Sequence, residues 1–381
     1  MEYRTRRAFL GAVTLFLAGC TSATKKFDGE KTQSDLVSLD ESWPQSRGNA
    51  KKTAYSQNSI ASEPHQRRWQ ADVGTHPNGA SMIGAGQIVA STIGDGISLV
   101  NGHGEVMDTE YVGLTATTTP AIIGQDFVVS AYDEAVYRIS SEESSVQWKS
   151  QIDGRPSPVT VTEDLNSVIV GTSKGELTGI RAEDGSHQWN INIDDPIKAS
   201  PAVFDGRAYV GGYNSGITAV SIENGEELWS VDTDGCIGPV AVDNNNETTI
   251  IAAGRDKILR GISAISGDVQ WEKPVGKHLT PPAIVDGTVF IGAETRVESF
   301  DVSSGNREWR VDLEDVVTPP VVTSESAVVA AGNEVVAINH NGEVDLTIGR
   351  TKSPPITHPV VLPEGILIGT EDGYLVAYIS S

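Results

Sequence analysis

The stretch Ala219-Val220-Ser221-Ile222-Glu223-Asn224-Gly225-Glu226-Glu227-Leu228-Trp229 ends in a pattern, Gly-x-x-x-Trp, that returns along the chain. Successive tryptophans from Trp148 to Trp309 are separated by 41, 40, 42 and 38 residues. A fixed period of this length predicts a solenoid or a propeller, because each repeat is a small unit that must stack on its neighbours. The copies with both residues are 185–189, 225–229, 267–271 and 305–309, and Ser144 replaces the glycine before Trp148.

Weaker copies extend the pattern in both directions. Gly104 is followed four residues later by Asp108, and Gly342 by Leu346, so two units keep the glycine and lose the tryptophan. Each unit also has a body in which a proline or small residue precedes alternating apolar runs and a turn. Eight such bodies begin near Ser81, Pro120, Pro158, Ser200, Pro239, Pro282, Pro320 and Pro359.

The bodies have the pattern of short strands. Apolar and polar residues alternate in 207–210 and 287–291, which indicates half-buried β-strand rather than helix. Asp205-Gly206 and Asn224-Gly225 are two-residue hairpin signals, because such turns need positive φ. Four short strands fit in about forty residues, the content of one propeller blade.

The two ends of the repeat region complement each other. The last body, 358–381, stops before the strand that would carry the tryptophan of its unit. Trp69, by contrast, lies in a strand, 66–73, that has no body before it. Pairing these ends would close the ring and remove free sheet edges. The sequence therefore predicts an all-β fold, an eight-bladed β-propeller of four-stranded antiparallel blades closed by the N-terminal strand around Trp69.

The N-terminus has the features of an export signal. Arg6 and Arg7 lie in a stretch that resembles the twin-arginine motif, and Leu17-Ala18-Gly19-Cys20 resembles a lipobox. The apolar run 8–19 is too short to span a bilayer, so it is typical of a signal peptide, the alternative being a short anchor that ends in cysteine. We expect a lipoprotein signal at 1–19, a lipid on Cys20, a flexible tether at 20–42 and the propeller at 43–381. This places the protein on the extracellular face of the cytoplasmic membrane.

The charge of the chain narrows the choice of host and partner. The formal net charge is −23, and removal of residues 1–19 leaves 25 basic and 50 acidic residues. Twin-arginine export suits a protein that folds around a cofactor before export, or a host that exports most proteins folded. The uniformly acidic surface favours the second kind of host, a halophilic archaeon, because high salt screens the repulsion among the carboxylates. It argues against nucleic acid as a partner, since phosphate binding needs clustered Lys and Arg.

The unit 219–229, and 299–309 with Ser299 in place of the alanine, resembles the tryptophan-docking repeat of pyrroloquinoline quinone (PQQ)-type propellers. Trp43-Pro44-Gln45-Ser46-Arg47-Gly48 is similar to the opening segment of such proteins, and the resemblance covers 43–381. It implies that tryptophans lock neighbouring blades together, with Asp301 keeping an aspartate of the motif that Ser221 and Ser263 replace. The residues given this role are Trp69, Trp148, Trp189, Trp229, Trp271 and Trp309.

Two branches of that family imply different functions. Quinoprotein dehydrogenases bind the quinone and calcium on the propeller axis and carry adjacent cysteines, which this chain lacks. The other branch, typified by BamB, is a lipid-anchored, eight-bladed ring that binds proteins without catalysis. The anchor, length and blade count match this second branch.

The residues offer little chemistry of their own. The seven histidines form no pair with zinc spacing, and neither Asp194-Asp195 nor 232–235 fits a calcium loop. Cys236 is left without an internal disulfide partner, and Asn246 heads a glycosylation sequon. The tryptophans could be a sugar-binding platform, but their fixed place in each unit favours blade packing.

We therefore expect a non-enzymatic, monomeric ring, anchored through Cys20, that binds surface or membrane proteins. No cofactor or metal is expected for that function. Two alternatives remain open: a divergent PQQ- and calcium-dependent dehydrogenase, and a polysaccharide-binding module.

Overall fold

A computed structural model describes residues 43–63, 65–74, 76–77, 82–84, 87–92, 96–107, 118–233, 235 and 238–380. All of them lie in one compact unit, and every regular element among them is a β-strand. Within this part of the chain, no helix has the length and apolar character needed to cross a membrane. Arg6, Arg7, Cys20 and Cys236 lie outside the described residues.

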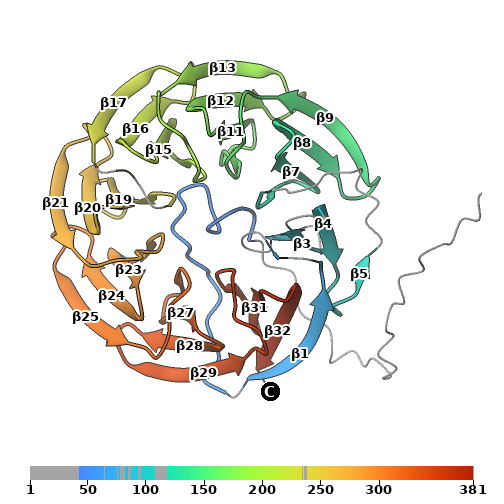
Figure 1. The fold of residues 1–381 in the computed structure, drawn as a ribbon, viewed down its shortest axis with the longest axis vertical. Helices are drawn as coiled ribbons and strands as arrows, with labels where there is room; N and C mark the ends of the chain where they lie inside the picture. The colour runs from blue at the N-terminus through green and yellow to red at the C-terminus, as the bar shows by residue number, and fades with distance from the viewer. Residues whose placement is uncertain are drawn as a thin grey trace, which may run out of the picture. The chain divides into compact units, whose positions relative to one another are not determined.

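The strands form eight four-stranded antiparallel sheets that follow one another around a ring (Figure 1). The predicted all-β, eight-bladed propeller is confirmed. Blades 1 to 4 consist of β2 (Met82–Gly84), β3 (Gln87–Thr92), β4 (Gly96–Val100) and β5 (Val106–Met107); β6 (Ala121–Ile123), β7 (Asp126–Ala131), β8 (Ala135–Ser140) and β9 (Ser145–Gln151); β10 (Thr160–Val161), β11 (Ser167–Gly171), β12 (Glu176–Arg181) and β13 (His187–Asn192); β14 (Ala202–Phe204), β15 (Arg207–Gly211), β16 (Gly216–Ser221) and β17 (Glu227–Asp232).

The second half of the ring repeats the same order from the innermost to the outermost strand. Blades 5 to 8 consist of β18 (Ala241–Asp243), β19 (Thr249–Ala253), β20 (Ile258–Ser263) and β21 (Val269–Pro274); β22 (Ala283–Val285), β23 (Thr288–Ala293), β24 (Arg296–Asp301) and β25 (Arg307–Asp312); β26 (Val321–Val322), β27 (Ser326–Ala331), β28 (Glu334–Asn339) and β29 (Val344–Arg350); β30 (Val360–Leu362), β31 (Gly365–Gly369), β32 (Tyr374–Ser380) and β1 (His65–Asp72).

The ring is closed by a strand from the other end of the chain, as the sequence predicted. β1 pairs antiparallel with β32, with His65 opposite Ser380 and Asp72 opposite Tyr374. Trp69 lies opposite Ala377, next to a bulge that begins at Arg67. Blade 8 is therefore built from both ends of the propeller, and no outer edge of β32 is left open.

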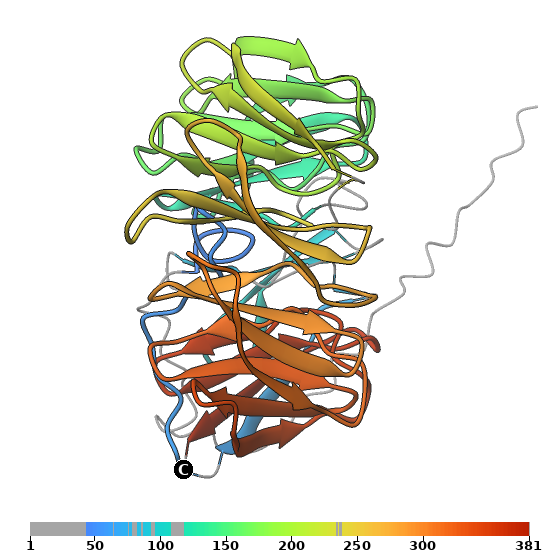
Figure 2. The same cartoon turned by 90° about the vertical axis from the view of Figure 1, so that its left-hand side faces the viewer.

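The inner three strands of each blade hold the core, and the outer strand faces solvent. β11 and β31 are buried along their whole length, whereas exposed residues recur along β17. Because successive strands run in opposite directions, the loops of each blade alternate between the two faces of the ring (Figure 2). We call face A the side with the loops after the first and third strands of each blade, and face B the other side.

Candidate functional site

The tryptophans of the repeat bind the blade that follows their own. Trp148 Nε1 donates a hydrogen bond to the carbonyl oxygen of Ala182 at 3.0 Å, and Trp229 Nε1 to that of Ala264 at 3.1 Å. Further bonds of this kind join Trp69 to Gly102, Trp189 to Ile222, Trp271 to Val302, and Trp309 to His340.

The small residues of the repeat make room for these rings. A Cβ atom at Gly225 would lie 2.9 Å from the ring of Trp189, and Gly225 has φ +76°. Ala219 lies directly opposite Trp229 on the neighbouring strand. In blade 2, Ser144 takes the place of this glycine. The tryptophan that it would face belongs to blade 1, where Asp108 takes the place of the tryptophan. The glycine is thus lost where its tryptophan is lost.

This packing leaves the tryptophans unsuited to stacking on sugars. Trp148, Trp189 and Trp271 are each only 8% exposed. A carbohydrate platform needs an open aromatic face, so the polysaccharide alternative receives no support from these residues.

The segment 43–58, which we call the axial segment, runs through the centre of the ring (blue in Figures 1 and 2). It meets the innermost strands of blades 2 to 8 in order. The backbone N–H groups of five corresponding inner-strand residues donate to its carbonyl oxygens at 2.6–2.9 Å: Ile122 to Pro44, Val203 to Ala50, Val242 to Lys51, Ile284 to Thr53, and Val322 to Ala54.

Blades 3 and 8 use side chains of the axial segment instead. Gln45 Oε1 accepts from Val161 N at 3.1 Å, and its Nε2 donates to Val161 O at 3.2 Å. Asn58 Nδ2 donates to Val361 O at 3.2 Å. The chain itself therefore occupies the axis and satisfies the inner edges of seven blades. The sequence of the opening segment 43–48 indicated the family, but it did not predict that this segment lies on the propeller axis.

The loops of the two faces differ in charge. Face A loops contain no Lys or Arg among the described residues, whereas face B has exposed cations at Arg155, Lys174, Lys198, Arg255, Lys257, Lys277 and Lys352. The exposed carboxylates of the face A loops are Glu105, Glu142, Glu143, Glu163, Asp164, Glu183, Asp184, Asp205, Glu223, Glu226, Glu247, Asp268, Asp286, Glu325, Glu343 and Glu364. The face B loops also have exposed carboxylates, so this face carries both signs of charge: Asp133, Glu134, Asp153, Asp194, Glu314, Asp315, Glu371 and Asp372.

On face B, Lys198, Tyr213 and Arg255 lie close together, and we call them the cationic cluster. Lys198 belongs to the loop between blades 3 and 4, Tyr213 to a loop of blade 4, and Arg255 to a loop of blade 5. Lys198 Nζ lies 3.3 Å from the ring centroid of Tyr213, and Arg255 Cζ lies 3.8 Å from it. Both cations are exposed, and neither has an ion-pair partner among the described residues. Arg255, first through a hydrogen bond and then through its charge, lowers the pKa of the Tyr213 hydroxyl, and the charge of Lys198 adds to this effect.

A buried carboxylate holds the cationic cluster in place. Asp195 accepts hydrogen bonds from the backbone N–H groups of Asn214 and Ser215, the latter at 2.7 Å, and from both side chains. Burial opposes ionisation of Asp195, but these bonds outweigh it and lower its pKa. The loop that carries Tyr213 is therefore preorganised. The sequence shows only that Asp194-Asp195 does not fit a calcium loop; the structure gives the buried Asp195 a structural role instead.

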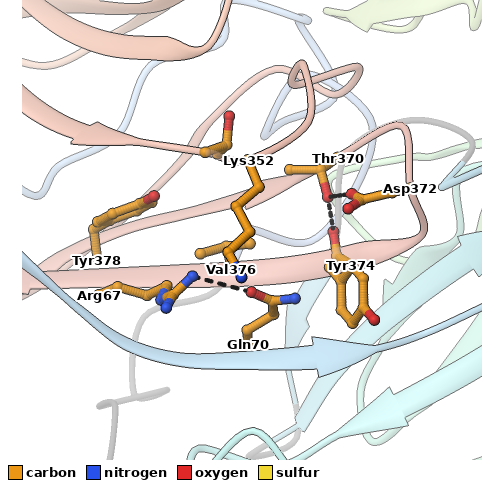
Figure 3. Close-up of a pocket in the computed structure, with 9 residues that line it drawn as sticks. Arg67, Gln70, Lys352, Thr370, Asp372, Tyr374, Val376 and Tyr378 are labelled. Carbon is orange, nitrogen blue, oxygen red and sulfur yellow. Dashed lines mark hydrogen bonds between the residues drawn. The ribbon is translucent and has the colours of Figure 1, made fainter.

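A small cleft lies on blade 8 between β1, β32 and the loop after β29 (Figure 3). The space that it encloses is only about 10 Å³, whereas ligand pockets are typically about 300–1,000 Å³. Arg67 donates to Gln70 Oε1 at 3.2 Å, and Thr370 to Asp372 at 2.7 Å. Its polar groups already bond one another, so we do not assign it a ligand.

The remaining predicted sites have separate positions. Asn246 is exposed in the loop between β18 and β19, on face A, and its glycosylation stays a prediction. The described residues contain no group of three or more His, Cys, Asp or Glu side chains placed to hold a metal ion. The lipidation and export residues lie outside the described part.

Comparison with known proteins places this ring in a family. The family model described as outer membrane protein assembly factor BamB matches residues 59–200, 133–339 and 255–378. The chain belongs to this BamB family. It is 24% identical to BamB of Yersinia pestis over 69% of the chain and 59% of that protein, and 24% identical to BamB of Bordetella pertussis over 67% and 70%. The first match thus spans about three fifths of its relative.

Solved structures of other proteins show the same fold at low identity. The computationally designed Ika8 protein aligns with a TM-score of 0.72 at 13% identity, over 82% of this chain and 98% of that one. A quinohemoprotein alcohol dehydrogenase of Pseudomonas putida HK5 aligns with a TM-score of 0.75 at 11% identity, over 89% and 80%. At these identities the likeness concerns the fold alone.

Proposed function

We propose that the chain is a non-catalytic propeller that binds other proteins through face B. The cationic cluster is the observation that carries this proposal. In a chain with 51 acidic and 28 basic residues, Lys198 and Arg255 are exposed without a carboxylate partner and flank one tyrosine. Arg and Tyr are enriched at protein interfaces, and exposed cations of this kind complement an acidic protein segment.

Membership in the BamB family supports a platform rather than an enzyme, since the relatives are named as assembly factors. The axial segment also occupies the place where the resemblance to quinoprotein dehydrogenases would put quinone and calcium. Dehydrogenase activity would therefore require displacement of residues that bond seven blades. A quinone titration that shows no binding would agree with the platform function.

We further propose that the platform works on the outer side of the cytoplasmic membrane of a halophilic archaeon. Export through Arg6 and Arg7 and a lipid on Cys20 would hold it there. The carboxylate-rich face A would remain solvated in high salt and would disfavour binding to nucleic acid.

A crosslinking pull-down from intact cells in high salt tests the function. We compare the wild-type chain with K198Q/R255Q and with the control K149Q/K174Q, which removes the same charge from lysines that already pair with Asp133 and Asp153. We expect one specific partner, recovered at least tenfold less with K198Q/R255Q and equally with the control. Recovery of no specific partner would contradict the platform, and equal recovery with both variants would contradict the role of the cationic cluster.

A further inference from the structure

The axial segment carries two cations into the interior of the ring. Lys52 is 0% exposed and Arg47 is 2% exposed. Both have the left-handed backbone, with φ of 60° and 61°. Strain of this kind in non-glycine residues is kept where the surrounding structure fixes it, commonly at functional sites. The fold therefore holds these two cations at the axis against a local cost.

The two cations lack a countercharge. Arg47 donates through its terminal nitrogens to the carbonyl oxygens of Pro282 at 2.6 Å and Pro320 at 3.1 Å, and Lys52 Nζ makes one long bond, 3.4 Å, to Gln45 Oε1. No ion pair joins either cation to a carboxylate among the described residues. The buried Arg260 and the partly buried Arg296, by contrast, pair with Asp256 and with Glu298. An unpaired buried charge is costly, so another group must offset it.

Unused hydrogen-bond donors accompany the two charges. Arg47 Nε and Trp43 Nε1 are buried without an acceptor, and the ring centroid of Trp43 lies 6.1 Å from that of His358. Arg47 lies close enough that its charge, after burial, lowers the pKa of Lys52 and of His358. Both unpartnered groups of the axial segment are thus N–H donors, on the same segment that carries the two buried cations.

We propose that a small monovalent inorganic anion of the chloride class binds on the propeller axis, held by Lys52 Nζ, Arg47 Nε and Trp43 Nε1. Such an ion accepts hydrogen bonds from all three donors and offsets one of the two charges. The carbonyl oxygens of the proline residues before β22 and β26 stabilise the guanidinium of Arg47. Because the donors are buried, a small ion suits the site and a larger ligand does not.

Halide-dependent stability tests this site. The unfolding midpoint of the purified full chain is measured at constant ionic strength while gluconate is replaced by chloride. Above the dissociation constant, each tenfold rise in chloride should raise the free energy of unfolding by about 1.4 kcal/mol through linkage. We expect this response in the wild type and in the control K51M, whose lysine bonds Asn244 at the surface, and its loss in K52M. An equal response in wild type and K52M would overturn the proposal.

A crystallographic measurement keeps the proposal falsifiable if K52M does not fold. Crystals of the wild-type chain grown in bromide should show an anomalous peak within hydrogen-bond reach of Lys52 Nζ and Arg47 Nε. Water density at that place, with no anomalous signal, would overturn the proposal. Neither experiment depends on the binding of a protein partner.

Discussion

At the scale of single residues, the tryptophan of the preceding blade packs so closely on the repeat glycine that a Cβ atom there would clash with the indole ring. Gly225 and Gly206 have similar backbones, with φ of +76° and +69°, but different surroundings. A Cβ atom would meet Trp189 at the first and nothing within 4 Å at the second. The pair therefore separates the cost of blade docking from the cost of backbone strain.

We predict that Gly225→Ala lowers the free energy of unfolding more than Gly206→Ala does. The second substitution should cost about 1 kcal/mol for the left-handed backbone, and the first a further 1–3 kcal/mol or so for displacing the indole. Denaturant unfolding of both variants measures the difference. Equal costs would show that the Gly–Trp contact does not contribute to stability.

Lys52 predicts a pH dependence of stability. Burial first, and then the charge of Arg47, lower its pKa from 10.5 to about 7. Between these values the unfolded chain binds more protons than the folded chain, so stability should rise with pH from about 7 to 10 in chloride-free buffer. The slope should not exceed about 1.4 kcal/mol per pH unit. Denaturation at several pH values should show this term in wild type and K51M and its absence in K52M; an unchanged profile in K52M would argue against the lowered pKa of Lys52.

At the scale of elements, the axial segment replaces the sheet partner that inner strands otherwise lack. Its carbonyl oxygens accept from Ile122, Val203, Val242, Ile284 and Val322. We predict that these amides exchange slowly with solvent in the wild type. Replacement of residues 44–57 by a Gly-Ser linker should speed their exchange, while Ile169, in the second strand of blade 3, keeps its protection. Fast exchange of the five amides in the wild type would contradict the bonding seen here.

Sequence reasoning succeeded for elements that repeat. The period, the alternation and the missing strand beside Trp69 predicted eight blades and their closure, because each copy carries the same local pattern. The axial segment occurs once and bonds partners far away, such as Asn58 to Val361, 303 residues apart. No local periodicity encodes such contacts. The cationic cluster was missed for the same reason, since Lys198, Tyr213 and Arg255 belong to separate units.

At the scale of the whole molecule, the repeats set a rigid ring and the loops give its two faces different charge patterns, with acidic groups alone on face A and groups of both signs on face B. Face A has carboxylates without loop cations, whereas face B gathers the exposed cations and the preorganised Tyr213. An acidic partner should therefore be repelled by face A and should approach face B at the cationic cluster. Electrostatic complementarity of this kind selects partners and their orientation.

Site-specific photocrosslinking in intact cells tests this orientation most directly. A photoreactive residue is placed at Lys257 on face B, in the loop that carries Arg255, and at Asn224 on face A as the matched control; both residues are exposed. The binding account predicts a discrete crosslinked protein from position 257 and none from position 224. The same product from both positions, or from position 224 alone, would contradict it.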